Sequence, residues 1–152
     1  MFASTIHNAD GRYLTDAELQ VLERYVQTYR TRKQTYRLLS LKANDLVLQS
    51  LKQLAMTHRK EVQTYGGKCK RDMTYTLQYI ARAVLMDEAE TFREGFALWM
   101  ENITRAVHKG DSAARACRCL KTEVKKALPI ECSALVVPYI DDLITAFANS
   151  II

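Results

Sequence analysis

A thiol among charged residues is the feature of this sequence with the clearest chemical potential. Cys69 follows a double glycine in the stretch "YGGKCKRD", residues 65–72. We expect a helix to begin at Lys68, because the two glycines favour a break in the chain. A helix N-terminus and neighbouring cations both stabilise a thiolate, so the sequence predicts that Cys69 is nucleophilic and suited to covalent attachment of a ligand.

The residues around Cys69 divide between two flanks of the predicted helix. One stripe contains Cys69, Asp72, Thr76 and Tyr79, and the other contains Arg71, Tyr75, Gln78 and Arg82. Arg71 lies about 200° round an ideal helix from Cys69, so both reach one ligand only if the ligand wraps the helix or the guanidinium arm reaches across. The pattern also fits a simpler interpretation, in which Cys69 is a first-turn residue and Lys68, Lys70 and Arg71 form a solvated face. The local residues leave both interpretations open.

The elements that must position this segment are expected to be helices. The chain has 152 residues, which is the size of one domain. It contains 5 Gly and 2 Pro and lacks the regularly spaced turn clusters that accompany short strands. Charged residues interrupt every apolar run before it reaches the ~20 residues that span a bilayer. We therefore expect an all-α, soluble protein of the cytosol that does not insert into a membrane.

Capping signals and apolar spacing predict where the helices lie. Thr15 and Glu18 form a capping box, which indicates a helix start. No Gly or Pro occurs from there to residue 65, so we expect two helices or one bent helix. An apolar seam after the double glycine predicts a helix that ends near Met86. Further helices are expected from a start marked by Asp87 and Glu88 to Val107, and over 113–128 and 133–148. Pro138 should kink the last one or leave a carbonyl unpaired, at a cost of about 3 kcal/mol.

Other residues with chemical potential give weaker signals. Cys117 and Cys119 match no zinc framework and are expected to pack in the interior, as are the aromatic residues Phe92, Phe96 and Trp99. No metal site is predicted, and the absence of a Ser-His-Asp grouping or a phosphate-binding glycine loop argues against an enzyme. The net charge is +5 with acidic residues interleaved, so nucleic acid is not an expected partner, and a basic nucleic-acid-binding module is a remote alternative.

Cys69, Arg71 and Asp72 resemble the Cys-x-Arg-Asp chromophore-attachment helix of the phycobiliproteins, the light-harvesting bilin proteins of phycobilisomes. The similarity continues in order along nearly the whole chain: "NADGRYL" resembles the N-terminal segment of phycocyanin-, allophycocyanin- and phycoerythrin-like subunits, "LWMENI" a central stretch, and "PYIDDLI" the closing helix. "ECSAL" at 131–135 resembles the segment around the second bilin cysteine of β-type subunits. The sequence is thus similar to that of a divergent family member.

The resemblance implies a single domain over residues 1–152 with a globin-like bundle of about six core helices. A short N-terminal helical arm, residues 1–14, would serve dimerisation by burying Phe2, Ile6, Tyr13 and Leu14. The implied partners are a homologous subunit or a second copy, together with linker proteins and a bilin lyase. The implied location is cytoplasmic, with the phycobilisome at the thylakoid surface.

The implied cofactor is an open-chain tetrapyrrole, phycocyanobilin or a similar bilin, held by a thioether at Cys69. Asp72 would lie against the central pyrrole nitrogens, where a carboxylate favours the protonated, strongly absorbing form. Arg71, helped by Lys68 or Lys70, would pair with the propionates.

The remaining implied roles are less firmly tied to one residue. Tyr75 or Tyr79 would pack against the rings. Cys132 would be a second attachment point, with an inert cysteine at a helix start as the alternative. Only Lys68 separates Gly67 from Cys69, whereas the family has a longer segment that covers the chromophore, so we expect a pocket without a lid. The alternative function is a non-pigment homologue that acts in phycobilisome assembly, regulation or turnover.

Overall fold

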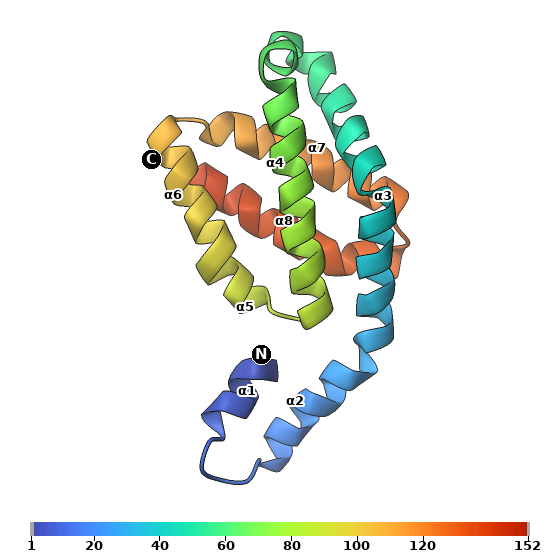
Figure 1. Ribbon diagram of the computed structural model, residues 1–152, viewed down its shortest axis with the longest axis vertical. Coiled ribbons are helices and arrows are strands. Elements are labelled where there is room, and N and C mark those ends of the chain that lie inside the picture. Colours follow the sequence, from blue (N-terminus) through green and yellow to red (C-terminus); the bar gives the residue numbers. More distant parts are fainter. Residues whose placement is uncertain (1, 152) are drawn as a thin grey trace.

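The computed structural model describes residues 2–151 as a bundle of helices with a two-helix arm at one end (Figure 1). In chain order the elements are α1 (Phe2–Asn8), α2 (Asp16–Gln27), α3 (Tyr29–Thr57), α4 (Arg59–Met86), α5 (Ala89–Phe92), the π-helical turn η1 (Arg93–Ala97), α6 (Leu98–Val107), α7 (Gly110–Ala127) and α8 (Ile130–Asn149). No strand occurs between residues 2 and 151. The predicted all-α class is confirmed, and the bundle itself comprises α3 to α8.

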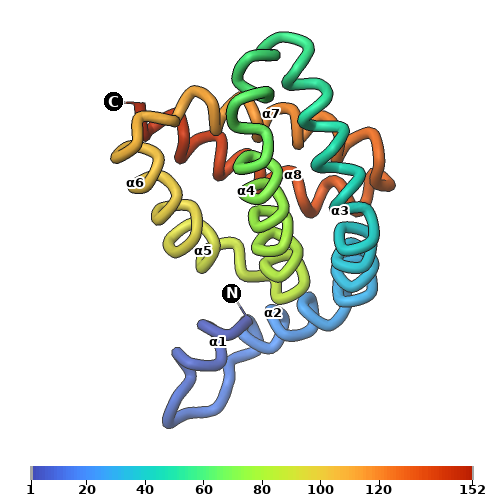
Figure 2. Tube along the Cα trace, turned by 45° about the horizontal axis from the view of Figure 1, so that its top comes forward, coloured from blue at the N-terminus to red at the C-terminus, as the bar shows by residue number. Residues whose placement is uncertain are grey.

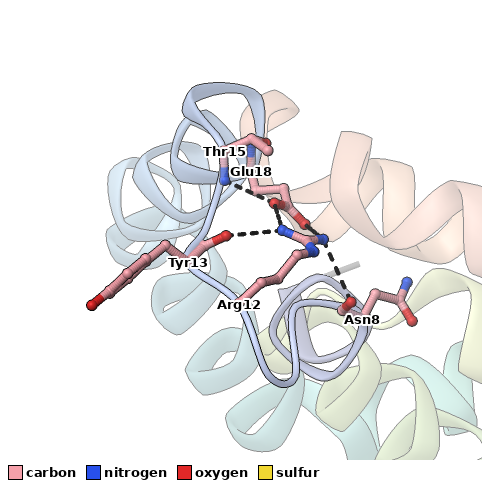
Figure 3. A network of polar contacts seen from close by, with 5 residues as sticks. All are labelled: Asn8, Arg12, Tyr13, Thr15 and Glu18. Atoms are coloured by element: carbon pink, nitrogen blue, oxygen red, sulfur yellow. Dashed lines mark hydrogen bonds and ion pairs between the residues drawn. The ribbon is translucent and has the colours of Figure 1, made fainter.

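The projecting arm extends beyond residues 1–14 and consists of α1, α2 and the turn between them, and the name is used for these elements from here on. One polar network holds the turn (Figure 3). The Glu18 backbone N–H donates to the Thr15 hydroxyl at 3.3 Å and the Thr15 N–H donates to the Glu18 carboxylate at 2.9 Å, so the predicted capping box is confirmed. Arg12 donates to both Glu18 oxygens, at 2.8 and 2.9 Å, and to the carbonyl oxygens of Tyr13 and Asn8. The hydrogen bond from Arg12 is the largest reason why the pKa of Glu18 falls to about 2.

The helix breaks between residues 12 and 87 differ from those expected. The chain changes direction at Thr28 and at His58, and α4 then continues without interruption from Arg59 to Met86. The prediction of a break at Gly66 and Gly67 is wrong, because both glycines lie inside α4. A helical glycine costs about 1 kcal/mol relative to alanine, which is less than the packing of the apolar seam that follows contributes. The predicted end near Met86 is confirmed, with Asp87 in the left-handed conformation at φ 54.

The core is formed where α3 and α4 cross α7 and α8. The largest fully buried side chains come from these four helices and include Leu39, Leu77, Ile80, Leu120, Ile140 and Leu143. The segment from α5 to α6 lies on the opposite side of α4 from α3 in both views (Figures 1 and 2) and packs against α8. Helix α4 is therefore flanked by α3 on one side and faces α6 on the other.

The last two helices meet at a close backbone approach. A Cβ atom on Gly110, the first residue of α7, would lie 2.4 Å from Ser150 Oγ and 2.8 Å from the carbonyl oxygen of Phe147. Helix α8 begins at Ile130, directly after Pro129 and earlier than expected. Pro138 lies inside α8 and is exposed, and its missing N–H deprives the carbonyl of residue 134 of its usual helical partner.

Within residues 2–151, none of the helices has both the length and the apolar character needed to cross a bilayer.

Candidate ligand cleft

A largely apolar cleft of about 610 Å³ lies between α4 on one side and η1, α6 and α7 on the other. This volume is in the range of pockets that hold small organic ligands. Its α4 wall extends from Glu61 to Tyr79, which corresponds to about 27 Å along a helix at 1.5 Å per residue. Two buried side chains, Leu54 of α3 and Phe147 of α8, line its interior. The cleft is therefore long and is built on the helix that carries Cys69.

Five of the residues predicted from the sequence line this cleft together: Lys68, Cys69, Asp72, Tyr75 and Tyr79. They recur at intervals of one, three, three and four residues, which keeps them on one side of α4. Met73 and Thr76 lie between them and are buried, so they connect the cleft wall to the core. The predicted stripe of Cys69, Asp72, Thr76 and Tyr79 is confirmed as one surface.

Arg71 and Lys70 are not part of this surface. They line a shallow depression on the neighbouring face of α4, together with Gly67, Thr74 and Gln78. Tyr75 borders both hollows and separates them. The angular separation of Arg71 from Cys69 on the helix therefore also separates them in the folded protein.

Cys132 is placed in the core. It is fully buried, at 0% exposure, in the first turn of α8 and does not line either hollow. A ligand tethered there would have to displace packed side chains, which is costly in a close-packed interior.

The thiol of Cys69 is half-buried and has a raised pKa of about 11. Loss of solvation is the largest cause, and the carboxylates of Asp72 and Glu61 add to it because they repel a thiolate. The prediction of an activated thiolate at a helix start is wrong, because Cys69 lies well inside α4. The positive field of a helix N-terminus does not extend past the first turn.

Aromatic rings close one end of the cleft. Tyr79 of α4 stacks on Phe96 of η1, with centroids 4.3 Å apart and planes inclined by 11°. The ring centroid of Phe92 lies 5.5 Å from that of Phe96 and 5.1 Å from that of Tyr139, with the Phe92 and Tyr139 rings perpendicular. The Tyr139 hydroxyl donates a hydrogen bond to the carbonyl oxygen of Ala83 at 3.2 Å. This chain of contacts fixes the second half of α4 against the π-helical turn, an irregularity that often marks functional sites.

The predicted core position of the aromatic triplet holds for Phe92, holds in part for Phe96, which packs against the core from the side of the cleft, and fails for Trp99. Phe92 is buried, whereas Phe96 and Trp99 line the cleft and the Trp99 side chain is 58% exposed. The helical spacing of the three residues was correct, but the π-helical turn and the gap beside α4 turn two of them toward the cleft. The prediction that Trp99 is a core residue is wrong.

The other end of the cleft is cationic. The Lys109 ammonium lies 4.7 Å from the centre of the Tyr65 ring. Arg115 forms an ion pair with Glu61 at 3.2 Å. The pKa of Glu61 is lowered mainly by a hydrogen bond with the Ser112 side chain, and also by Arg115. Sequence patterns gave no reason to single out Lys109, because only the fold brings the start of α7 beside the first half of α4.

The two thiols of α7 pack as expected. Cys117 is buried behind the cleft, and its pKa rises to about 12, mainly through burial and then through the nearby Cys69. Cys119 is half-buried against the core. In the described part of the chain, no three His, Cys, Asp or Glu side chains are grouped to hold a metal ion.

The sequence of the chain was compared with known protein families. The model of the family described as phycobilisome protein matches residues 4–147. The chain belongs to the phycobilisome protein family. The match covers nearly the whole chain and supports the all-α, globin-like fold for this phycobilisome protein. No curated protein matches the chain.

The side chains of this phycobilisome protein fit the type of ligand that the family implies. The cleft has the length for an extended ring system, aromatic side chains for its walls, and a thiol and a carboxylate one helical turn apart. Lysines at one end match acidic groups on the ligand. The cleft therefore offers aromatic side chains to the rings of a bilin, a carboxylate to its pyrrole nitrogens and lysines to its propionates.

Proposed function

We propose that this phycobilisome protein is a phycobiliprotein-like subunit that carries an open-chain tetrapyrrole through a thioether at Cys69. The observation that carries the proposal is the position of Cys69 and Asp72 in one aromatic-walled cleft, three residues apart on α4. When bound, a bilin supplies absorption of visible light through its conjugated rings. The protein's part is to tether the bilin, to stabilise its protonated form and to hold its rings.

Cys69 has the role of tether. Its sulfur bonds to a carbon of a vinyl-type double bond on the bilin, and the thiol hydrogen is transferred to the neighbouring carbon, so that nothing leaves. Because the pKa of Cys69 is raised to about 11, few molecules carry the reactive thiolate at neutral pH. This supports a bilin lyase as a partner in attachment.

Asp72 has the role of counter-ion. A carboxylate beside pyrrole nitrogens stabilises their protonated form, and a partly desolvated cleft strengthens this interaction. Lys68, which lines the same cleft, pairs with a propionate. Arg71 and Lys70 would reach a propionate only where the ligand extends past Tyr75 into the neighbouring depression.

Tyr75 and Tyr79 have the role of holding the rings extended. Tyr79 is itself fixed by stacking on Phe96 at 4.3 Å, so it offers a rigid wall rather than a mobile side chain. Rigidity matters because torsion of a free bilin dissipates its excitation as heat. We therefore propose a light-harvesting or light-absorbing role in association with other phycobilisome subunits, and no enzymatic one.

The test is covalent pigment on the denatured chain. The protein is produced in cells that supply a bilin and a lyase, and the denatured chain is examined by zinc-enhanced fluorescence, because only a covalent bilin survives denaturation. We expect an orange-red band that is absent from Cys69→Ala. The matched control Cys132→Ala, which removes a cysteine outside the cleft, should keep the band. A band that persists in Cys69→Ala would contradict the tether.

A second candidate function is that of a non-pigment homologue in phycobilisome assembly, regulation or turnover. The observation in its favour is the raised pKa of Cys69, which makes the thiol unreactive without assistance. A wild-type chain that stays colourless in the same cells would support this candidate.

A further inference from the structure

We infer that Lys109 orients the ligand by binding its acidic groups, so that the propionates extend toward Tyr65 and the rings lie against Tyr79. This inference rests on the proposed function and deepens it. Lys68 of α4 is one cation of the cleft, and Lys109, which lies outside α4, is the second that would bind the acidic groups. The attachment motif would instead suggest Arg71, which lies on the neighbouring face of α4.

The two ends of the cleft are closed by contacts of unlike chemistry. Tyr79 stacks on the neutral ring of Phe96 at one end, and the ammonium of Lys109 lies over Tyr65 at the other. Tyr65 and Tyr79 are 14 residues apart, or about 21 Å along α4. The cleft is therefore polar at one end and aromatic at the other, which distinguishes the two orientations of an asymmetric ligand.

The charge at the polar end is not neutralised by the protein. Glu61 is the carboxylate that lines this end, and Arg115 already pairs with it at 3.2 Å. Neither Lys68 nor Lys109 forms an ion pair with any residue between 2 and 151. Two cations that line a cleft and lack a counter-ion favour an anionic ligand, and each retains its donors for a carboxylate.

The aromatic end would reject the same acidic groups. Tyr75, Thr76, Tyr79, Phe96 and Trp99 line it, and none of them carries a charge. A carboxylate placed there would lose solvation without gaining a cation. Asp72 lies between the two ends and would repel a carboxylate while it attracts protonated nitrogens. The preferred ligand thus has acidic arms on one part and an extended ring system on another.

The experiment uses two probes with the same tetrapyrrole, namely free biliverdin, a bilin with two carboxylates, and its dimethyl ester, in which both carboxylates are replaced by uncharged methyl esters. Both are titrated into full-length Cys69→Ala protein, in which the thioether cannot form. The single tryptophan, Trp99, lines the cleft, so quenching of its fluorescence reports binding. Lys109→Gln is compared with Lys125→Gln, an exposed lysine of α7 that does not line the cleft.

We expect Lys109→Gln to weaken biliverdin binding about 3- to 5-fold, the range of a solvent-accessible ion pair. Binding of the dimethyl ester should not change, and Lys125→Gln should leave both probes unaffected. The difference between the probes should shrink at high salt, because screening weakens exposed charge pairs. Equal effects of Lys109→Gln on both probes, or no effect on either, would overturn the inference.

Failure of the proposed function would look different. If neither biliverdin nor its ester quenches Trp99 in the Cys69→Ala parent, the cleft does not bind a bilin, and the function falls together with the inference. If both probes bind with equal affinity in the parent and in every lysine variant, the function stands and only the role of Lys109 is rejected.

Discussion

The guanidinium of Arg32 donates a hydrogen bond to the carbonyl oxygen of Leu85, 53 residues further along the chain. It also donates to the carbonyl oxygen of Tyr25 and, through Nε, to the Thr28 hydroxyl at 3.0 Å. Leu85 and Tyr25 lie in the last turns of α4 and α2, where carbonyl groups lack helical partners and form the negative end of the helix dipole. Arg32 is 2% exposed, so this buried cation is matched by two helix ends rather than by a carboxylate. It ties the arm to the helix that carries the cleft.

Replacing Arg32 by methionine should therefore lower the free energy of unfolding by about 2–4 kcal/mol, since buried carbonyl groups lose charge-assisted hydrogen bonds. Urea unfolding followed by circular dichroism measures the change. Arg37→Met, at an exposed position five residues further along α3, is the control and should stay within about 0.5 kcal/mol of the wild type. Equal effects of the two substitutions would show that the contacts of Arg32 do not stabilise the fold.

Two glycine-to-alanine substitutions should have opposite effects on stability. At Gly110 the new Cβ would lie 2.4 Å from Ser150 Oγ and 2.8 Å from the carbonyl oxygen of Phe147, so α7 and α8 must separate, and we expect a loss of about 1–3 kcal/mol. At Gly67 nothing lies within 4 Å of the new atom, and the backbone is already helical. We expect Gly67→Ala to add about 0.5–1 kcal/mol to the free energy of unfolding. Chemical unfolding of both variants tests the pair, and destabilisation by Gly67→Ala would indicate that α4 is not helical at the glycines.

The reactivity of Cys69 should depend steeply on pH. With a pKa of about 11 in place of 9.0, the thiolate fraction at pH 8 is about a hundredfold lower than for an unperturbed thiol. Because the raised pKa favours the neutral thiol, the rate should rise about tenfold per pH unit up to about pH 11. Iodoacetamide labelling of the native protein, quantified by peptide mass spectrometry, measures the rate against the unfolded chain.

The cause of the raised pKa of Cys69 can be tested with the same labelling by iodoacetamide. Asp72→Asn removes the largest electrostatic contribution to the raised pKa, so labelling of Cys69 should become faster. Asp45→Asn, at an exposed position on α3, should leave the rate unchanged. Labelling of native Cys69 as fast as that of the unfolded chain would contradict the half-buried position of the thiol.

Periodicity in the sequence was enough to predict the all-α class and the stripe that faces the cleft, but not all of the helix boundaries. The spacing of Cys69, Asp72 and Tyr79 depends only on the helical repeat, and the capping box at Thr15 depends only on neighbouring residues. The double glycine misled the prediction because propensity is a local quantity, whereas α4 is held by packing against the core. The predicted helix start at Lys68 is wrong for this reason, and the activated thiolate is wrong also because burial and the carboxylates of Asp72 and Glu61 raise the pKa of Cys69.

The cleft itself depends on contacts between segments far apart in the sequence. The approach of Lys109 to Tyr65, and that of Phe96 to Tyr79, requires α6 to run beside α4 in the opposite direction. No local pattern encodes this, and the π-helical turn that carries Phe96 has no sequence signal that we recognised. The family resemblance supplied the fold, and the helical repeat already placed Arg71 on another flank of α4 than Cys69, but nothing in the sequence placed Lys109 beside Tyr65.

The exposed apolar residues of the arm predict how this phycobilisome protein assembles. Ile6 is 46% exposed, Tyr13 is 96% exposed and Val26 of α2 is 70% exposed, whereas Phe2 stacks on Tyr25 within the chain at 4.2 Å. Apolar side chains exposed together on a projecting element indicate a surface for a partner. We expect deletion of residues 1–14 to reduce the protein to a monomer.

A single charged substitution in the arm should also weaken association of the subunits, without removing the arm. Val26→Glu places a carboxylate on the exposed apolar face of α2, and a charge buried in an interface without a partner is strongly unfavourable. Gln20→Glu, at an exposed position of the same helix, introduces the same charge outside this apolar set and should not change the oligomeric state. Sedimentation velocity compares the wild type, the deletion and the two substitutions at equal concentration. If the deletion and Val26→Glu both sediment as the wild-type oligomer does, the subunits associate through the bundle, and the arm has a role within the chain, where Arg12 and Arg32 hold it.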